Sequence, residues 1–351
     1  LHPFGFRDLE ARDSMRANAI FRIASQTKAL TTVAAMILQE EGKLLITDPV
    51  GKYLPEYQKT KVAIGRDSGR YEIVDAKRAI TIRDLMTHTA GISYGSGPAR
   101  ELWTQAGING WYFADRDEPI RETIRRLASL PFDAQPGERF VYGYATDILG
   151  VIVEVVSGKP LDQFIAERIL KPLKLNDTQF FLPPSKRNRL VTVYSAGKDG
   201  TVSRTADDGG MQSQGKYVDG PRKSFSGGAG LTSTASDYGR FLQMLLNGGE
   251  MDGVRILSRK SVELMLASHL SPEKYPEPGN AFGLGFRVLT DLGANGQLGS
   301  VGQWGWGNAY HGTYWVDPKE KMIVVYMTQL IPAGSIDDFA KVRALIYQAL
   351  N

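Results

Sequence analysis

The 351-residue sequence contains no cysteine, which excludes disulfides, a thiol nucleophile and cysteine-ligated zinc. Its four histidines show no His-x-x-x-His spacing, so we expect no built-in metal centre. No apolar run approaches the roughly 20 residues that cross a bilayer, and no window holds five consecutive basic residues. The sequence therefore predicts neither a membrane span nor a nucleic-acid surface. These absences leave a soluble globular protein, an enzyme or a small-molecule binder that needs no cofactor.

What the sequence does contain is ordinary for a globular chain. Hydrophobic residues make up 42% and charged residues 23%, which excludes disordered and collagen-like proteins. Positive and negative charges are scattered and leave a formal net charge of +4. The chain begins Leu1-His2-Pro3, with neither an initiator Met nor a signal-like segment, so we expect a trimmed start. The compartment, whether cytoplasmic, periplasmic or secreted, and the oligomeric state stay open.

Apolar periodicity predicts helices, of which the clearest spans residues 25–42. One apolar stripe runs from Leu30 to Leu38, Ser25 stands at the N-terminal cap and Gly42 supplies the stop. Further helices are expected at about 145–157, from Pro160, from Ser236 and at about 337–350. The strand signal lies late, at 282–289, 311–316 and 321–329, and predicts an antiparallel meander.

This order of elements predicts one α/β (α+β) domain, residues 1–351, that is divided into two lobes. The α/β lobe takes about residues 1–60 and 228–351, with an antiparallel sheet flanked by helices. A mostly helical lobe of about residues 61–227 is inserted between them. Residues 195–227, rich in Gly, Ser, Asp and Lys, are expected to form a long surface loop beside a pocket.

Ser-x-x-Lys occurs four times, so the context decides which serine is a candidate nucleophile. The copies at Ser195 and Ser213 lie in the glycine-rich loop, and the copy at Ser271 lies among three prolines. Only Ser25 and Lys28 open a periodic helix, where a three-residue spacing puts both side chains on one face. A hydroxyl becomes nucleophilic when a base within hydrogen-bond reach takes its proton, and a lysine can serve. The alternative is a helix cap beside a solvated lysine.

Two other motifs fail on their context. Residues 91–95, Gly-Ile-Ser-Tyr-Gly, match the Gly-x-Ser-x-Gly nucleophile elbow, which needs a buried strand before it. The preceding residues 86–90 make no apolar run, so we interpret this segment as a loop. Gly210 to Lys216 has P-loop spacing, but Tyr217 occupies the Ser/Thr position and no strand precedes it.

Residues 21–30, Phe-Arg-Ile-Ala-Ser-Gln-Thr-Lys-Ala-Leu, resemble the nucleophile helix of the serine β-lactamase-like and penicillin-binding-protein-like hydrolases. The likeness extends over nearly the whole chain, through residues 48–55, 85–91 (Leu-Met-Thr-His-Thr-Ala-Gly) and 227–234. The resemblance implies a β-lactamase/transpeptidase-like fold. It also implies that Ser25 is the nucleophile and Lys28 its basic partner.

The second catalytic element of that family, Tyr-x-Asn, is absent. Tyr142-Gly143-Tyr144 stands instead, and it is similar to the variant in the bacterial family VIII carboxylesterases. By this resemblance Tyr142 is catalytic and Tyr144 replaces the asparagine. A phenol near Lys28 could share the proton-relay role, so either Lys28 or Tyr142 could be the general base.

The third element, Lys-Thr-Gly or His-Thr-Gly, is also absent. Trp306-Gly307-Asn308 resembles the Trp-Gly-Gly form of such esterases, and residues 304–306, Trp-Gly-Trp, are the other possible register. A backbone N–H after this motif, that of Ala309, could pair with the N–H of Ser25 as an oxyanion hole. The candidate substrate and oxyanion pocket comprises Trp306, Gly307, Ala309, Tyr144, Tyr310 and His311. His88 is expected to be a structural histidine that is hydrogen-bonded in its turn.

The resemblance implies a serine carboxylesterase that cleaves short-chain esters through an acyl-enzyme on Ser25, with weak hydrolysis of some β-lactams. Without a cationic third motif, nothing there clamps the carboxylate of a β-lactam or peptide, which fits a neutral ester. One alternative is a β-lactamase or D-Ala-D-Ala carboxypeptidase. The other is a non-catalytic penicillin-recognising domain.

Overall fold

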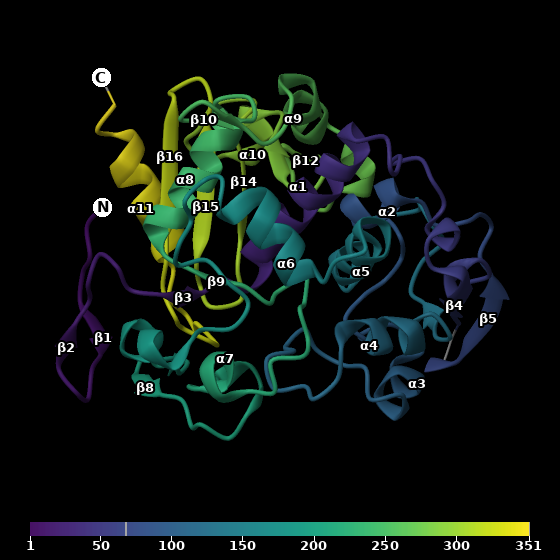
Figure 1. Cartoon of the computed structure of the whole chain (residues 1–351), viewed down its shortest axis with the longest axis horizontal. Helices are drawn as coiled ribbons and strands as arrows, with labels where there is room; N and C mark the ends of the chain where they lie inside the picture. Colours follow the sequence, from purple (N-terminus) through teal and green to yellow (C-terminus); the bar gives the residue numbers. More distant parts are fainter. Residues whose placement is uncertain (67–68, 351) are drawn as a thin grey trace.

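The computed structural model describes residues 1–66 and 69–350. A five-stranded antiparallel sheet in the order β12-β13-β14-β15-β16 forms one part of the molecule (Figure 1). Its strands are β12 (Asn280–Phe282), β13 (Arg287–Leu289), β14 (Trp304–Gly307), β15 (Thr313–Asp317) and β16 (Met322–Tyr326). The expected meander and the α/β (α+β) class are confirmed.

A single strand over 282–289 was the wrong prediction, because the chain turns between β12 and β13. Gly285 has a φ of 84°, and a Cβ there would lie 2.7 Å from Thr32 Oγ1 on helix α1 (Thr27–Glu40). Only a glycine lets the backbone approach the helix so closely in this conformation. Leu284 and Phe286 are fully buried within this turn.

Helix α1 lies at the middle of the molecule and follows a short 3₁₀ turn, η1 (Ala24–Gln26). The sequence predicted one apolar stripe, whereas every residue from Thr27 to Leu38 is buried. Helix α5 (Ala145–Ser157) packs against α1, and strand β14 lies against η1. Gly42 (φ 69°) and Gly158 (φ 70°) stand just beyond the two helices, as predicted. The predicted cap at Ser25 is wrong, because its side chain makes no capping hydrogen bond.

The remaining helices surround this centre. They are α2 (Ile82–Met86), α3 (Arg100–Gln105), α4 (Ile120–Leu127), α6 (Leu161–Ile165), α7 (Lys216–Asp219), α8 (Ala235–Leu246), α9 (Arg259–Leu266), α10 (Leu292–Asn295) and α11 (Asp338–Tyr347). Helix α8 packs on β16 at the sheet, whereas α2, α4 and α6 pack on α5. In Figure 1, α2 and α4 lie on the side of α1 away from the sheet. The lobe boundaries near residues 60 and 228 stay a prediction.

Short strands complete the fold. They are β1 (Phe6–Asp8) with β2 (Asp13–Ser14), β3 (Phe21–Arg22) with β9 (Thr232–Ser233), β4 (Lys61–Gly65) with β5 (Tyr71–Asp75) and β6 (Pro131–Phe132), β7 (Tyr194–Ala196) with β8 (Val202–Arg204), and β10 (Glu250–Met251) with β11 (Val254–Arg255). Residues 195–227 are therefore more ordered than the predicted surface loop. They contain part of the β7–β8 hairpin, helix α7 and the fully buried Ser213.

Membrane-spanning helices and clusters of metal-binding side chains are both absent from the described residues. In residues 1–66 and 69–350, no helix combines the length and the apolar character that a membrane span requires. Within the same ranges, no group of three or more His, Asp or Glu side chains is arranged to hold a metal ion.

Candidate active site

Ser25 lies in the 3₁₀ turn that joins β3 to α1. It is half-buried, while its neighbours Ala24 and Gln26 are fully buried. Ala24 has a φ of 37°, a left-handed conformation that a residue with a Cβ rarely adopts. The first backbone bond of η1 starts from the Gln26 N–H, so the Ser25 N–H has no partner within the turn. Ser25 thus presents both its hydroxyl and a backbone N–H that has no partner within the turn.

Lys28 lies one helical turn further along, with an exposed fraction of only 2%. Its Nζ donates hydrogen bonds to Gly228 O at 2.8 Å and to Tyr94 Oη at 3.0 Å. The nitrogen also lies 4.6 Å from the centre of the Tyr142 ring. Among the described residues, no carboxylate lies within 4.0 Å of it. Neutral oxygens and aromatic rings therefore hold the amine in place.

Tyr142 comes from the segment just before α5, and its ring faces Lys28. Its Oη accepts a hydrogen bond from Trp306 Nε1 at 3.2 Å. Within the described chain, no hydrogen bond joins Ser25 Oγ to Lys28 Nζ or to Tyr142 Oη. Catalytic hydrogen bonds are often long in unliganded sites and shorten when substrate binds. The structure thus places Lys28 beside Tyr142, with Ser25 one turn of helix away.

Tyr94 is a site residue that the sequence reasoning missed. It belongs to the Gly-Ile-Ser-Tyr-Gly segment, which is a loop, as predicted. Ser93 is buried there, and its Oγ accepts the N–H groups of Gly95 (3.0 Å) and Ser96 (3.2 Å). Tyr94 Oη instead reaches Lys28. Burial, with a smaller contribution from Tyr142, raises the pKa of Tyr94, so its phenol stays neutral.

Gly143 explains why the two tyrosines meet. A Cβ at Gly143 would lie 2.3 Å from Ile92 O, so only glycine lets the Tyr142 segment lie against the Tyr94 loop. The two phenol rings then pack edge to face with their centres 5.8 Å apart. The sequence held one sign of this contact, the glycine between two tyrosines in Tyr142-Gly143-Tyr144. A glycine at such a position indicates that another segment of backbone packs closely against it.

Asp147 is a second residue that was missed, and it positions the turn that holds Lys28. This fully buried carboxylate on α5 accepts hydrogen bonds from Ser226 Oγ at 2.6 Å and from Gly228 N at 3.0 Å. A Cβ at Gly228 would lie 2.4 Å from Asp147 Oδ2. Burial raises the pKa of Asp147, and the charge of Lys28 opposes part of that rise. The contact fixes Gly228 O, the closer of the two acceptors of Lys28.

Strand β14 settles which register of the third motif faces this site. Trp304 is fully buried, and its ring packs against Phe286 at 5.0 Å. Trp306 is half-buried and donates to Tyr142. The register with Trp306 and the half-buried Gly307 therefore adjoins the site. Asn308 closes the following turn, since its Oδ1 accepts N–H groups from Tyr310 (2.9 Å) and Gly312 (3.0 Å).

Ala309 follows β14 by two residues and packs against a buried cluster that includes Ala24, the residue before Ser25. It is half-buried, and its N–H has no hydrogen-bond partner in the described chain. The described residues thus show no hydrogen-bond partner for the amides of Ser25 and Ala309, and β14, which precedes Ala309, lies against the turn η1 that contains Ser25. Paired backbone donors of this kind can hold a developing oxyanion.

Three of the candidate pocket residues are engaged elsewhere. Tyr144 is fully buried and its hydroxyl donates to Gly110 O. Tyr310 is also fully buried, and its hydroxyl donates to Met211 O at 2.7 Å. His311 Nε2 lies 2.7 Å from Asp338 Oδ1 on α11. With these partners, the three side chains contribute to the packing of the fold and do not form an open wall of a substrate pocket.

His88 differs from its expectation. The ring is fully buried at a backbone φ of 55°, and its Nδ1 has no partner in the described residues. Its centre lies 4.7 Å from that of the Tyr142 ring. Burial, and secondarily the charge of Lys28, lower the pKa of His88, so this imidazole is neutral. It supports Tyr142 as an apolar ring rather than through a hydrogen bond.

Comparisons with known proteins show the family to which the chain belongs. Residues 1–347 match the family model described as Beta-lactamase, and the chain belongs to that family. Its fold is that of the serine β-lactamase-like proteins, close to the family VIII esterases, and it is a serine hydrolase.

Particular relatives give the range of chemistry. The chain is 36% identical to Protein Rv1367c of Mycobacterium tuberculosis (strain ATCC 25618 / H37Rv), over 97% of this chain and 85% of that protein. It is 28% identical to Esterase EstB of Burkholderia gladioli, over 94% of this chain and 82% of that protein. The structure of EstCE1, a hydrolase with promiscuous acyltransferase activity, is 27% identical and superposes with a TM-score of 0.83 over 98% of this chain and 88% of that chain. Further relatives are named as an acyltransferase and as putative D-alanyl-D-alanine carboxypeptidases.

Proposed function

We propose that this protein is a carboxylesterase that cleaves short-chain esters of neutral alcohols through an acyl-enzyme on Ser25. The observation that carries the proposal is the buried amine of Lys28, which lies one turn from Ser25 and between the phenols of Tyr94 and Tyr142. A non-catalytic binding domain has no need of a buried base beside a half-exposed serine.

The proposed reaction has two halves. Ser25 Oγ attacks the ester carbonyl carbon, and its proton passes to the Lys28–Tyr142 pair, which then protonates the departing alkoxide. The N–H groups of Ser25 and Ala309 hold the carbonyl oxygen while it carries negative charge. In the second half, water attacks the acyl group, gives its proton to the same pair and releases the acid, and Ser25 Oγ regains a proton.

The surroundings of the site favour a neutral substrate. Trp306 and Tyr142 present aromatic groups there, and residues 303–312 contain neither Lys nor Arg. A β-lactam or a peptide with a free C-terminus carries a carboxylate that a cation at this position would bind. The lack of one favours esters over these substrates.

A second candidate is a D-alanyl-D-alanine carboxypeptidase or a β-lactamase, because relatives of this chain are named as putative D-alanyl-D-alanine carboxypeptidases. The specificity constants, kcat/KM, for p-nitrophenyl butyrate and for a chromogenic cephalosporin separate the two. The esterase proposal expects the ester to exceed the cephalosporin by at least about 100-fold. A larger value for the cephalosporin would replace the proposal with the second candidate.

Substitution of the nucleophile tests the assignment of Ser25. Ser25→Ala should lower ester turnover by at least about 1,000-fold, since no other group can form the acyl-enzyme. Ser271→Ala is the matched control, because Ser271 heads another Ser-x-x-Lys copy and is exposed. The assignment fails if Ser25→Ala stays within a few-fold of the parent.

A further inference from the structure

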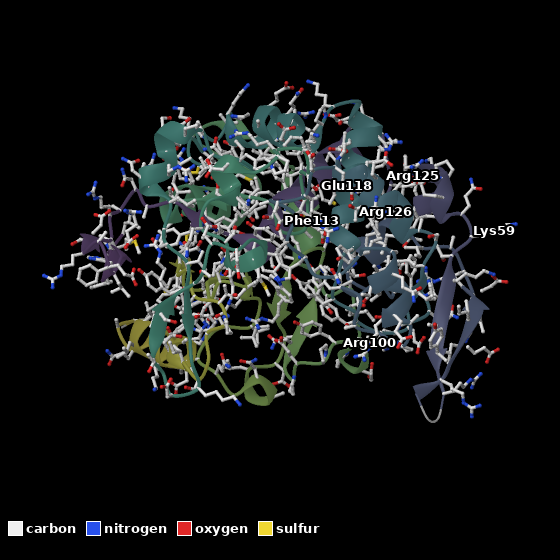
Figure 2. The ribbon with its side chains drawn as sticks, turned by 90° about the horizontal axis from the view of Figure 1, so that it is seen from below. Lys59, Arg100, Phe113, Glu118, Arg125 and Arg126 are labelled. Atoms are coloured by element: carbon white, nitrogen blue, oxygen red, sulfur yellow. The ribbon has the colours of Figure 1, made fainter. Side chains whose placement is uncertain are left out.

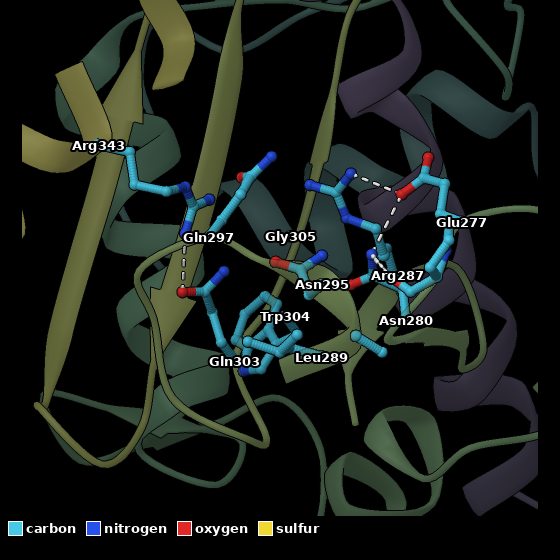
Figure 3. Close-up of a pocket in the computed structure, with 12 residues that line it drawn as sticks. Glu277, Asn280, Arg287, Leu289, Asn295, Gln297, Gln303, Trp304, Gly305 and Arg343 are labelled. Atoms are coloured by element: carbon cyan, nitrogen blue, oxygen red, sulfur yellow. Dashed lines mark hydrogen bonds and ion pairs between the residues drawn. The ribbon is translucent and has the colours of Figure 1, made fainter. Parts of the chain in front are cut away.

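A polar cavity of about 370 Å³ lies between β13, β14, helix α10 and helix α11 (Figure 3). Successive residues of a strand point to opposite faces of the sheet. Arg287 on β13 pairs with Gly305 on β14, which pairs with Trp315 on β15, so these three share one face. Trp306, beside Tyr142, is turned to the other face. The cavity therefore lies across the sheet from the Ser25 site.

Two guanidinium groups line this cavity. Arg343 of α11 has an exposed fraction of 9%, and its guanidinium carbon lies 4.2 Å from the centre of the Trp315 ring. Its Nη1 donates to Leu298 O at 3.1 Å and to Gln303 Oε1 at 3.0 Å. Among the described residues, no carboxylate lies within 4.0 Å of Arg343. A guanidinium that is buried without a counter-ion is costly unless a bound anion offsets the loss of water.

The second guanidinium, that of Arg287, has a carboxylate partner of its own. Its Nη1 lies 3.0 Å from Glu277 Oε2, and Asn280 Nδ2 lies 3.4 Å from the same oxygen. The cavity thus holds two cations against one anion. Burial lowers the pKa of Arg343, whereas Tyr347 and Asp317 raise it and the charge of Arg287 lowers it. Asp317 offsets part of the positive charge but does not line the cavity, whose lining carries one positive charge in excess.

Neutral polar groups surround the two arginines. In Figure 3 the head groups of Arg343, Gln297 and Arg287 face the same space. The same three residues also line an adjoining cavity of about 330 Å³ beneath α11. Carboxamides from four residues line the first cavity: Asn280, Asn295, Gln297 and Gln303. A carboxamide both donates and accepts, which is the chemistry that recognises hydroxyl groups.

We propose that this cavity binds a polyhydroxy carboxylate, an acid of the sugar-acid type. The single carboxylate lies between the guanidinium groups of Arg343 and Arg287 and balances the excess positive charge of the cavity lining. The hydroxyl groups bond to the carboxamides and to Glu277. A volume of about 370 Å³ is enough for a six-carbon chain of this kind. The site is separate from the ester-cleaving centre and does not depend on it.

Calorimetric titration with gluconate and with sorbitol tests the proposal, because sorbitol has the same chain length with a hydroxymethyl group in place of the carboxylate. The parent should bind gluconate at least tenfold more tightly than sorbitol, and at least tenfold more tightly than acetate, which lacks the hydroxyl groups. Arg287→Gln should weaken gluconate binding at least tenfold. Arg100→Gln is the matched control, since Arg100 is an exposed arginine on the distant α3 (Figure 2).

Arg343→Lys keeps the charge but removes the planar fork, so it should also weaken gluconate at least tenfold. If this buried substitution prevents folding, Arg287→Gln decides the question, because Arg287 is only partly buried. Ester turnover should be unchanged in Arg287→Gln. Absence of gluconate binding by the parent would overturn the proposal, as would parent-like binding by Arg287→Gln. Equal affinity for gluconate and acetate would overturn the sugar-acid class.

Discussion

The Tyr94→Phe substitution tests whether Tyr94 positions Lys28, because it removes the phenol oxygen that Lys28 contacts and keeps the aromatic ring. In Tyr94→Phe, Lys28 Nζ keeps Gly228 O at 2.8 Å and loses the acceptor at 3.0 Å. Lys28 is 2% exposed, so water cannot replace the lost oxygen. A hydrogen bond of a charged group contributes about 1.5–3 kcal/mol. If that free energy holds Lys28 in its reactive position, kcat should fall about 10- to 150-fold.

The assay is steady-state hydrolysis of p-nitrophenyl butyrate, with kcat and KM measured separately over a range of pH. We expect most of the loss in kcat and less than a threefold change in KM, because Tyr94 acts through Lys28. Tyr57→Phe is the matched control, since Tyr57 is buried and its hydroxyl donates to Ile124 O at 2.8 Å, in the distant α4. Tyr57→Phe should lower stability and leave kcat intact. A parent-like kcat in Tyr94→Phe, or an equal loss in both variants, would refute the reasoning.

Two further predictions concern a single hydrogen bond and an ion pair. Trp306→Phe keeps an aromatic ring but removes the N–H that donates to Tyr142 Oη at 3.2 Å. The kcat for the ester should therefore fall about 2- to 12-fold. An unchanged kcat would show that this hydrogen bond has no catalytic role. Hydrogen bonds from Arg126 lower the pKa of Glu118 from 4.5 to about 2 (Figure 2). The Glu118–Arg126 pair therefore stabilises the fold fully above pH 4.5, and its contribution is lost as the pH falls towards 2. Urea unfolding should therefore show Glu118→Gln less stable than the parent by about 1 kcal/mol at pH 7 and equal to it near pH 2. The control Glu122→Gln, which removes only a surface pair with Arg125, should show no such difference. A gap that persists near pH 2 would contradict the ion pair as its cause.

The parts of the site that depend on local spacing could be predicted from the sequence. The geometry of one helical turn and the choice among four copies of the motif made Ser25 and Lys28 candidates, and the resemblance to the family implied their roles. Tyr142 needed more, because its distance along the chain from Ser25 carries no information about contact. The resemblance to the family supplied it, and the structure places its ring beside Lys28.

Residues that act through tertiary contacts could not be predicted. Tyr94 reaches Lys28 because Gly143 lets two loops touch, and Asp147 acts through the amide of Gly228. Neither contact leaves a periodic signal. Conversely, the sequence analysis placed both Trp306 and Tyr310 in the candidate pocket. The turn that Asn308 closes takes Tyr310 into the core.

The position of the covalent bond tests the central claim most directly. A fluorophosphonate probe should add one equivalent of mass to the intact protein, and the modified peptide should contain Ser25. Ser25→Ala should show no adduct under the same conditions. An adduct on another serine, such as Ser93, or no adduct on a protein that still hydrolyses the ester, would contradict a nucleophile at the start of α1.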